Sequence, residues 1–419
     1  MAYRIRIAAL ALAALAAPAA AQQLSIHDAQ ALATAAAPQL IAQSAAVRAA
    51  RASSGYAQEL PDPRLIAAIE NVPTDGADKW SLTRDGMTMR RVGVMQEFPR
   101  EEKRRLRGER AEAEARREEA ALALAESNLR RDVAVTWVEA WSAERQLALL
   151  RDLARESDLG VTSAQAALAG GRGTAAEPLA ARLAAAQVED RIIDARRMVT
   201  RAREQLARWI GRDAQRPLEE APDFSRLPVS PENLLAELEH HPHVAMFGPI
   251  QAMADAEVKL ADAARRPDWS LELTYGARGS AYSNMLSLEV RVDLPLFEGR
   301  RQGPATAARV AAAEQVRSQA EDARRAHLSE VRVAIADWQA ALERAQRIES
   351  TQLPLAQERL GAATAAYSGG RGELMPVLEA RRADVETRMT LLQARSEAGR
   401  AWAQLATLAT AHESTKDKP

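Results

Sequence analysis

The longest uninterrupted helical pattern limits the fold of this chain more than any other feature. The run from Glu101 to Ala169 has no proline and only two glycines, and apolar residues such as Val133, Trp137 and Trp141 recur at three- and four-residue steps. At 1.5 Å per residue, a helix of this length reaches about 100 Å. No single-chain globule needs such a rod, so the pattern favours a coiled-coil barrel or tunnel.

The chain also repeats itself once. The sequence Gly170-Gly-Arg-Gly173 returns as Gly369-Gly-Arg-Gly372, a shift of 199 residues. Ala37-Pro38 corresponds to His241-Pro242, and Phe98-Pro99 to Leu294-Pro295, at similar shifts. Each half reads helix, two strands, long helix, glycine turn, helix, which predicts a duplicated unit of about 200 residues, far longer than a solenoid repeat.

The pattern predicts five segments. They are a signal peptide at 1–21, a first repeat at 22–215 with strands near 62–98, an equatorial linker at 216–230, a second repeat at 231–410 with strands near 268–295, and a disordered tail at 411–419. The signal peptide is indicated by Arg4 and Arg6, a short apolar run and the cleavage site Ala19-Ala-Ala21. We expect continuous helices over 24–54, 232–264 and 305–368, the last kinked at Pro354.

The clearest strand signal is in the second hairpin. One face of the segment from Leu286 to Leu294 carries only Leu and Val, and the other carries Ser287, Glu289, Arg291 and Asp293. A half-buried soluble sheet would alternate in the same way. In a membrane barrel, the charged face would border an aqueous lumen and the apolar face would meet lipid. Four strands cannot close a barrel, whereas three copies would supply twelve.

Composition excludes several classes of function. Lys+Arg number 56 and Asp+Glu 57, so the net charge of −1 argues against a nucleic-acid binder. The absence of cysteine removes disulfides, thiolate metal sites, cysteine catalysis and a lipidated N-terminal cysteine. We find no phosphate loop, nucleophile elbow or paired-histidine zinc motif, so we expect no enzyme, no catalytic residue and no cofactor.

One histidine cluster, His240-His-Pro-His243, has residue types that bind metals. Its proline breaks the i,i+4 spacing of a helical metal site, and its repeat equivalent near Ala36–Gln39 has no histidine. We therefore expect no metal site there.

Four segments carry a resemblance to a known family. They run from Leu24 through Pro38, from Val94 to Pro99, from Val290 to Phe297 and from Tyr367 to Ala380. Together with the duplication they resemble the TolC family of outer-membrane efflux channels, over about residues 24–410. Gln96-Glu-Phe-Pro99 followed by the basic run Lys103–Arg107 is similar to the heavy-metal cation (CzcC-like) branch.

The resemblance implies a mainly α fold with a small β part. It implies a homotrimer with a 12-stranded β-barrel in the lipid of the outer membrane of a Gram-negative bacterium and a 12-helix α-barrel in the periplasm. Such a channel passively conducts substrate, here heavy-metal cations such as cobalt, zinc, cadmium or copper, from a periplasmic membrane-fusion adaptor and an inner-membrane RND pump. Alternatives are an exit duct for drugs, organic compounds or secreted proteins, or, in another class, a periplasmic coiled-coil adaptor or structural protein.

The resemblance also implies roles for particular residues. The turns that would dock the adaptor contain Gly170, Gly171, Arg172, Gly173, Gly369, Gly370, Arg371 and Gly372. Glu177 and Glu379 are the candidate gate, because family carboxylates near this position constrict the tunnel and pair with basic groups. Pro376 departs from that pattern where an acid is expected, and ordinary exposed glutamates remain the alternative. Ser287, Glu289, Arg291 and Asp293 would line the barrel lumen.

Overall fold

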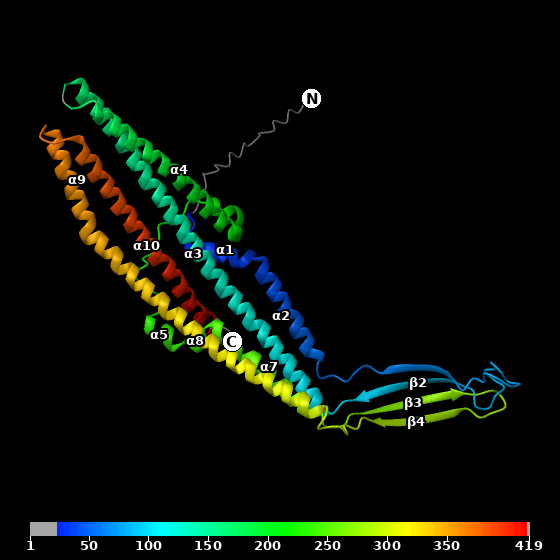
Figure 1. Ribbon diagram of the computed structural model, residues 1–419. Helices are drawn as coiled ribbons and strands as arrows, with labels where there is room; N and C mark the ends of the chain where they lie inside the picture. Colours follow the sequence, from blue (N-terminus) through cyan, green and yellow to red (C-terminus); the bar gives the residue numbers. More distant parts are fainter. Residues whose placement is uncertain (1–22, 172, 417–419) are drawn as a thin grey trace, which may run out of the picture. The chain divides into compact units, whose positions relative to one another are not determined.

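The computed structural model describes residues 23–171 and 173–416 (Figure 1). The expected signal peptide at 1–21, Arg172 and residues 417–419 lie outside the described part of the chain. Helices dominate and four strands form one small sheet, so the mainly α fold with a small β part is confirmed. Among the described residues, none of the helices is both long and apolar enough to cross a membrane.

The same order of elements occurs twice. The first half contains α1 (Ile26–Ala36), α2 (Pro38–Tyr56), β1 (Arg64–Glu70), β2 (Met89–Phe98), α3 (Glu101–Ala169), α4 (Ala176–Ile210) and the short η1 (Gly211–Gln215). The second half contains α5 (Pro231–Ala236), η2 (Leu238–His240), α6 (Pro242–Ala245), α7 (Phe247–Ala263), β3 (Trp269–Ala277), β4 (Met285–Val292), α8 (Gln302–Arg347), η3 (Ile348–Gln352), α9 (Leu353–Ser368) and α10 (Leu374–Lys416). Helix α10 continues past residue 410, where the tail was expected to begin.

The helices expected over 24–54 and 232–264 are not continuous, and each has a break immediately before a proline. Ala37 is extended, with ψ 116°, and ends α1 immediately before Pro38. His241 is extended in the same way, with ψ 136°, before Pro242. The ring of proline disfavours helical geometry in the preceding residue, so the two halves break at equivalent positions.

The kink expected at Pro354 takes a specific form. The backbone from Ile348 to Gln352 is a π-helical turn, η3, directly before α9, whose second residue is Pro354. Proline has no N–H to donate to the preceding turn, and a π turn is a recognised cause of bending in a long helix.

The contacts of the chain divide it into two units. The first comprises residues up to 37, 129–230 and 333–407, and the second comprises 38–128, 231–332 and the residues after 407. In the first unit, α3, α4, α9 and α10 pack together (Figure 1). Their core includes the clusters Leu147, Leu150, Leu153, Val188, Ile192, Ala195, Val385 and Ala164, Ala181, Leu374, Val377. Small alanines let the helices approach closely, as their abundance in the sequence indicates.

Two equivalent tryptophans each hold the start of their own repeat inside the first unit. Trp137 Nε1 donates a hydrogen bond of 2.9 Å to the carbonyl oxygen of Leu24, and Trp338 Nε1 donates one of 2.8 Å to that of Phe224. Leu24 itself pairs with the linker, since its N–H donates to Pro217 O at 2.8 Å. Each long helix therefore holds the segment that precedes the first helix of its own repeat.

The sheet lies in the second unit. Its strands are antiparallel in the order β1-β2-β3-β4. The registers place Leu65, Val94, Leu273 and Leu288 in one row on one face, and Arg64, Met95, Glu272 and Glu289 in a row on the other. The sheet thus has one apolar face and one polar face. Of the strands that the structure describes, β1 and β4 each pair on one side only.

Candidate functional site

The turn between α3 and α4 depends on glycine. Gly171 and Gly173 have φ values of +71° and +114°, in the region that side chains with a Cβ rarely adopt. The N–H of Gly170 donates to Ala166 O at 2.9 Å and that of Gly171 to Leu168 O at 3.0 Å, which satisfies the end of α3. This turn and its counterpart at Gly369–Gly372 are called the tip turns below.

The second tip turn closes α9 in a related way. Gly370 has φ +69°, and the N–H of Arg371 donates to Ala366 O at 3.0 Å. A Cβ on Gly372 would lie 3.1 Å from the Cβ of Ala366, so glycine also permits a close approach here. The exposed Arg371 faces solvent in the described structure. The repeated Gly-Gly-Arg-Gly sequence therefore makes two tight helix reversals of the kind expected.

The two candidate gate carboxylates lie near the tip turns in the first unit. Glu177 is half-buried, with Oε2 2.8 Å from the point where a Cβ on Gly173 would lie. Glu379 is exposed and lies beside a partly apolar hollow of about 230 Å³ between α3, α4 and α10. Within the described residues, the structure shows ion pairs at other carboxylates of these helices.

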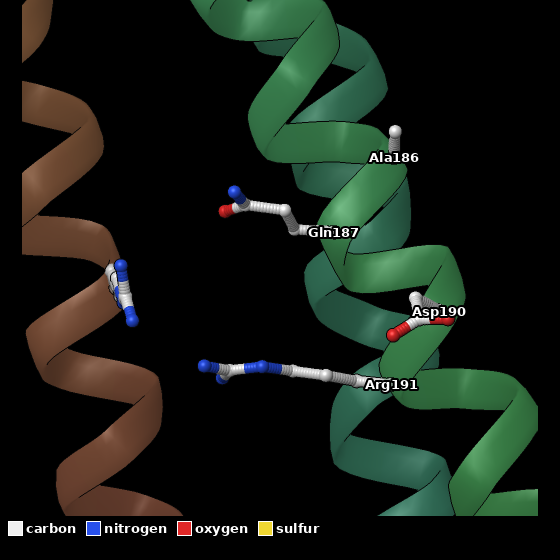
Figure 2. A pocket seen from close by; sticks show the side chains of 5 residues that line it. Ala186, Gln187, Asp190 and Arg191 are labelled. Atoms are coloured by element: carbon white, nitrogen blue, oxygen red, sulfur yellow. The ribbon is translucent and has the colours of Figure 1, made fainter.

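One of these ion pairs joins α4 to α10. Arg191 Nη2 lies 3.5 Å from Glu386 Oε1, and Arg382 Nε donates to the same oxygen at 2.9 Å. The Arg382 hydrogen bond holds the pKa of the Glu386 carboxyl below its usual range, against the opposing effect of burial. Figure 2 shows Arg191 and Gln187 projecting from α4 into a hollow of about 430 Å³ that Arg382 also lines.

A second pair joins α3 to α10. Arg381 Nη1 lies 3.5 Å from a carboxylate oxygen of Glu156 and donates to the backbone oxygen of Glu156 at 3.1 Å. Sequence reasoning missed Arg191, Glu386, Arg381 and Glu156. No local motif marks them, because each pairs with a residue on a helix that is distant in the sequence.

The predicted lumen residues fall on the polar face of the sheet, with one exception. Ser287, Glu289 and Arg291 alternate along β4, and Arg291 Nη2 donates to Glu289 Oε1 at 2.8 Å. Asp293 lies beyond the end of β4, where its N–H donates to Asp268 O at 3.0 Å. The expected apolar face is also present, and Phe98 and Trp269 stack at one end of it with centroids 4.3 Å apart.

The polar face contains a network that sequence reasoning missed. Arg91 Nη1 lies 2.6 Å from Glu70 Oε1, and Arg91 Nη2 lies 3.3 Å from Glu272 Oε1 and 2.8 Å from Thr274 Oγ1. The first hairpin was harder to read because Arg90 interrupts the alternation. Arg90 lies on the apolar face near the end of the strand, where its Nη2 donates to Arg278 O at 3.4 Å.

The basic run at Lys103–Arg107 begins with a structural lysine. Lys103 is buried, and its ammonium donates to Arg266 O at 2.6 Å and to Asp268 Oδ2 at 2.8 Å. The other oxygen of Asp268 accepts the N–H of Arg100 at 3.0 Å. These contacts join the first turn of α3 to the start of β3. The ammonium group of Lys103 therefore binds to groups of its own chain.

The histidines form a buried group in the second unit. His241 Nδ1 lies 3.0 Å from His327 Nε2, and the ring of His243 stacks on that of His327 with centroids 4.8 Å apart. Burial lowers the pKa of His327, although Glu330, whose Oε2 lies 3.4 Å from Nδ1, partly opposes this. Among the residues described, no group of three or more His, Cys, Asp or Glu side chains is arranged to hold a metal ion.

Comparisons with known proteins agree with this geometry. Residues 236–411 match the family described as outer membrane efflux protein. The cobalt-zinc-cadmium resistance protein CzcC of Cupriavidus metallidurans is 26% identical over 346 residues, which cover 81% of this chain and 77% of that protein.

Solved structures share the fold. The structure of CusC has a TM-score of 0.77 at 18% identity and covers 91% of both chains. The outer membrane protein VceC from Vibrio cholerae has a TM-score of 0.75 at 20% identity and covers 92% of this chain and 95% of its own. The outer-membrane channel OprN has a TM-score of 0.76 at 18% identity, with 91% and 89% covered. The second half of this chain thus matches the outer membrane efflux protein family, and the chain as a whole has a TolC-like fold.

Proposed function

We propose that this chain is the exit duct of a tripartite RND-type efflux system for heavy-metal cations such as cobalt, zinc, cadmium or copper. The observation that carries this proposal is the similarity to a cobalt-zinc-cadmium resistance protein over 81% of the chain. Conduction through a duct is passive and needs no catalytic residue. An inner-membrane RND pump supplies the energy and reaches the duct through a periplasmic membrane-fusion adaptor.

The working unit in this proposal is a homotrimer. Unpaired N–H and C=O groups at a strand edge are not tolerated in lipid, so the edges of β1 and β4 need partners. Pairing β4 of one copy with β1 of the next closes twelve strands around a lumen. The exposure of Leu286, Leu288 and Val290 supports this arrangement, because such side chains suit contact with outer-membrane lipid.

The tip turns are the proposed adaptor-docking sites. Gly170, Gly171, Arg172 and Gly173 would present one docking loop, and Gly369, Gly370, Arg371 and Gly372 the other. Their support is the paired geometry of two short helix reversals in the same unit. Glu177 and Glu379 remain gate candidates, and we add the Glu386 and Glu156 ion pairs as contacts that restrain the helices of the tunnel.

Metal tolerance tests the substrate. A strain that lacks the gene should lose tolerance to cobalt, zinc, cadmium or copper salts, and a plasmid copy should restore it. A variant that lacks residues 64–98 and 269–292 is the matched negative control, since it loses all four strands and keeps the long helices. Unchanged metal tolerance together with a new sensitivity to organic compounds would overturn the metal assignment and favour the drug duct.

Disulfide trapping tests the trimer, and the chain has no cysteine to interfere. Leu288 on β4 and Leu65 on β1 lie in one row, three strand spacings or about 14 Å apart, too far for a disulfide within one chain. L288C combined in turn with L65C, A67C or I69C should therefore yield covalent dimers and trimers from the outer-membrane fraction. L288C with V92C, on the interior strand β2, should not, and a soluble periplasmic monomer would favour the adaptor class.

A further inference from the structure

Alternating charges cross the polar face of the sheet in one belt. From β1 to β4 the belt contains Glu70, Arg91, Glu272, Arg291 and Glu289. Arg91 lies 2.6 Å from Glu70 and 3.3 Å from Glu272, while Arg291 lies 2.8 Å from Glu289 and 3.9 Å from Glu272. Every strand thus contributes one or two charged groups to one connected network, which extends over several rows of the sheet.

The register places two carboxylates of the belt opposite each other. Glu272 and Glu289 are direct cross-strand partners, and like charges opposite each other destabilise a sheet. Arg91 on one side and Arg291 on the other offset this repulsion. The belt still has three carboxylates against two guanidinium groups, so each copy of the belt carries one negative charge in excess.

Exposure separates the belt into an anchored part and an open part. The side chains of Arg91 and Glu272 are only 21% and 13% exposed, and Thr274 Oγ1 also accepts from Arg91. The side chains of Glu289 and Arg291 are 52% and 56% exposed. Solvent and ions therefore reach the Glu289–Arg291 pair most easily, while the excess carboxylate lies among Glu70, Arg91 and Glu272.

We propose that this belt is a charge filter in the barrel lumen that favours hydrated cations, with Glu289 as the ion-facing carboxylate. Arg91 is a positioning residue, because it holds Glu272 between two guanidinium groups and leaves Glu289 to the lumen. The filter rests on the proposed trimeric channel, in which three copies of the belt would form a ring. Charge at the wall of a channel raises the local concentration of counter-ions.

The filter discriminates by charge and not by metal identity. A twelve-stranded barrel leaves an aqueous lumen, so a passing ion keeps its water and senses the belt through the electric field alone. Such a field extends about 8 Å at physiological salt and about 30 Å at 0.01 M. The preference should therefore be strongest in dilute salt.

Bilayer electrophysiology on the purified full chain tests the filter. In a potassium chloride gradient at low ionic strength, the reversal potential of the wild type should show a preference for cations. Glu289→Gln should lower the cation-to-anion permeability ratio about twofold or more, and Arg291→Gln should raise it. Arg91→Gln should change the ratio and broaden the conductance levels, because Glu272 loses its anchor, and Arg91→Lys should restore part of the wild-type behaviour.

Arg90 provides the matched control. It is the sequence neighbour of Arg91 but lies on the opposite face, so Arg90→Gln should leave the ratio unchanged. Trimer yield from membranes verifies that each variant assembles. Wild-type channels whose selectivity is the same as that of Glu289→Gln would overturn the filter and leave the efflux duct standing, whereas a chain that forms no channel at all removes both proposals.

Discussion

At the scale of single residues, the buried histidine group should make the stability of the chain depend on pH. His327 and His241 are almost fully buried, and their ring nitrogens share one hydrogen bond. Since Nδ1 of His327 faces the Glu330 carboxylate, the neutral ring donates there and accepts from His241 at Nε2. A second proton on His327, at Nε2, would remove the acceptor and break this arrangement.

The unfolding midpoint should consequently fall in mild acid. The folded pKa of His327 lies below the value of about 6.5 in the unfolded chain. The unfolded state therefore binds the proton first, and stability is lost as the pH falls below about 6.5 and until it passes the folded pKa. His327→Asn should flatten this slope, measured by circular dichroism between about pH 8 and pH 5.

The exposed His27 offers the comparison. His27→Asn should keep the wild-type slope. If His327→Asn and the wild type lose stability equally over this range, the buried group does not titrate as argued.

For the tryptophan pair, the sequence predicts a position on a helix but not the hydrogen-bond partner of the indole. The helical period places Trp137 among apolar residues that recur along one helix. This pattern does not reveal that both indoles donate to backbone carbonyls, at Leu24 and Phe224. Acceptors of this kind come from segments more than 100 residues away, so only the folded chain shows them. Glu272 as a partner of Arg91 and Arg191 as a partner of Glu386 were missed for the same reason.

At the scale of elements, most helix and strand positions could be predicted because local rules decide them. The run without proline becomes α3 from Glu101 to Ala169, and the glycine turns end the helices where expected. Errors occur where one residue overrides the periodicity. Pro38 and Pro242 split helices whose apolar pattern continues, and the π turn before Pro354 replaces a simple kink.

Glycine-to-alanine substitutions should lower the stability of the chain in the tip turns and raise it within a helix. Gly171 and Gly370 have open space around the Cβ position but positive φ, so the cost of alanine there is conformational alone, about 1–2 kcal/mol. Gly160 lies within α3 and also has open space, so Gly160→Ala should instead stabilise the chain by about 0.5–1 kcal/mol. Denaturant unfolding of the three variants measures both the expected loss and the expected gain in the free energy of unfolding. Equal effects at all three sites would contradict the strain at the tip turns.

At the scale of the whole molecule, the duplicated order and the fold class follow from the sequence, while the contacts between hairpins do not. The long helices of the first unit meet through an apolar core that any coiled coil would have. The ion pairs of Glu386 and Glu156 add links between specific helices. Exposed pairs of this kind contribute only about 0.2–1 kcal/mol each. Loss of one such pair should therefore change the stability of the chain little.

Neutralising Glu386 should therefore change channel behaviour more than stability. Glu386→Gln leaves Arg191 and Arg382 facing each other without the carboxylate that both contact, so their repulsion favours separation of α4 from α10. A change of about 1 kcal/mol alters a two-state population about fivefold. We expect larger or more frequent open conductance levels in planar bilayers, with an unfolding midpoint close to that of the wild type. Glu189→Gln removes an exposed carboxylate from α4 and should leave conductance unchanged; identical recordings from the two variants would mean that the Glu386 contacts do not restrain the tunnel.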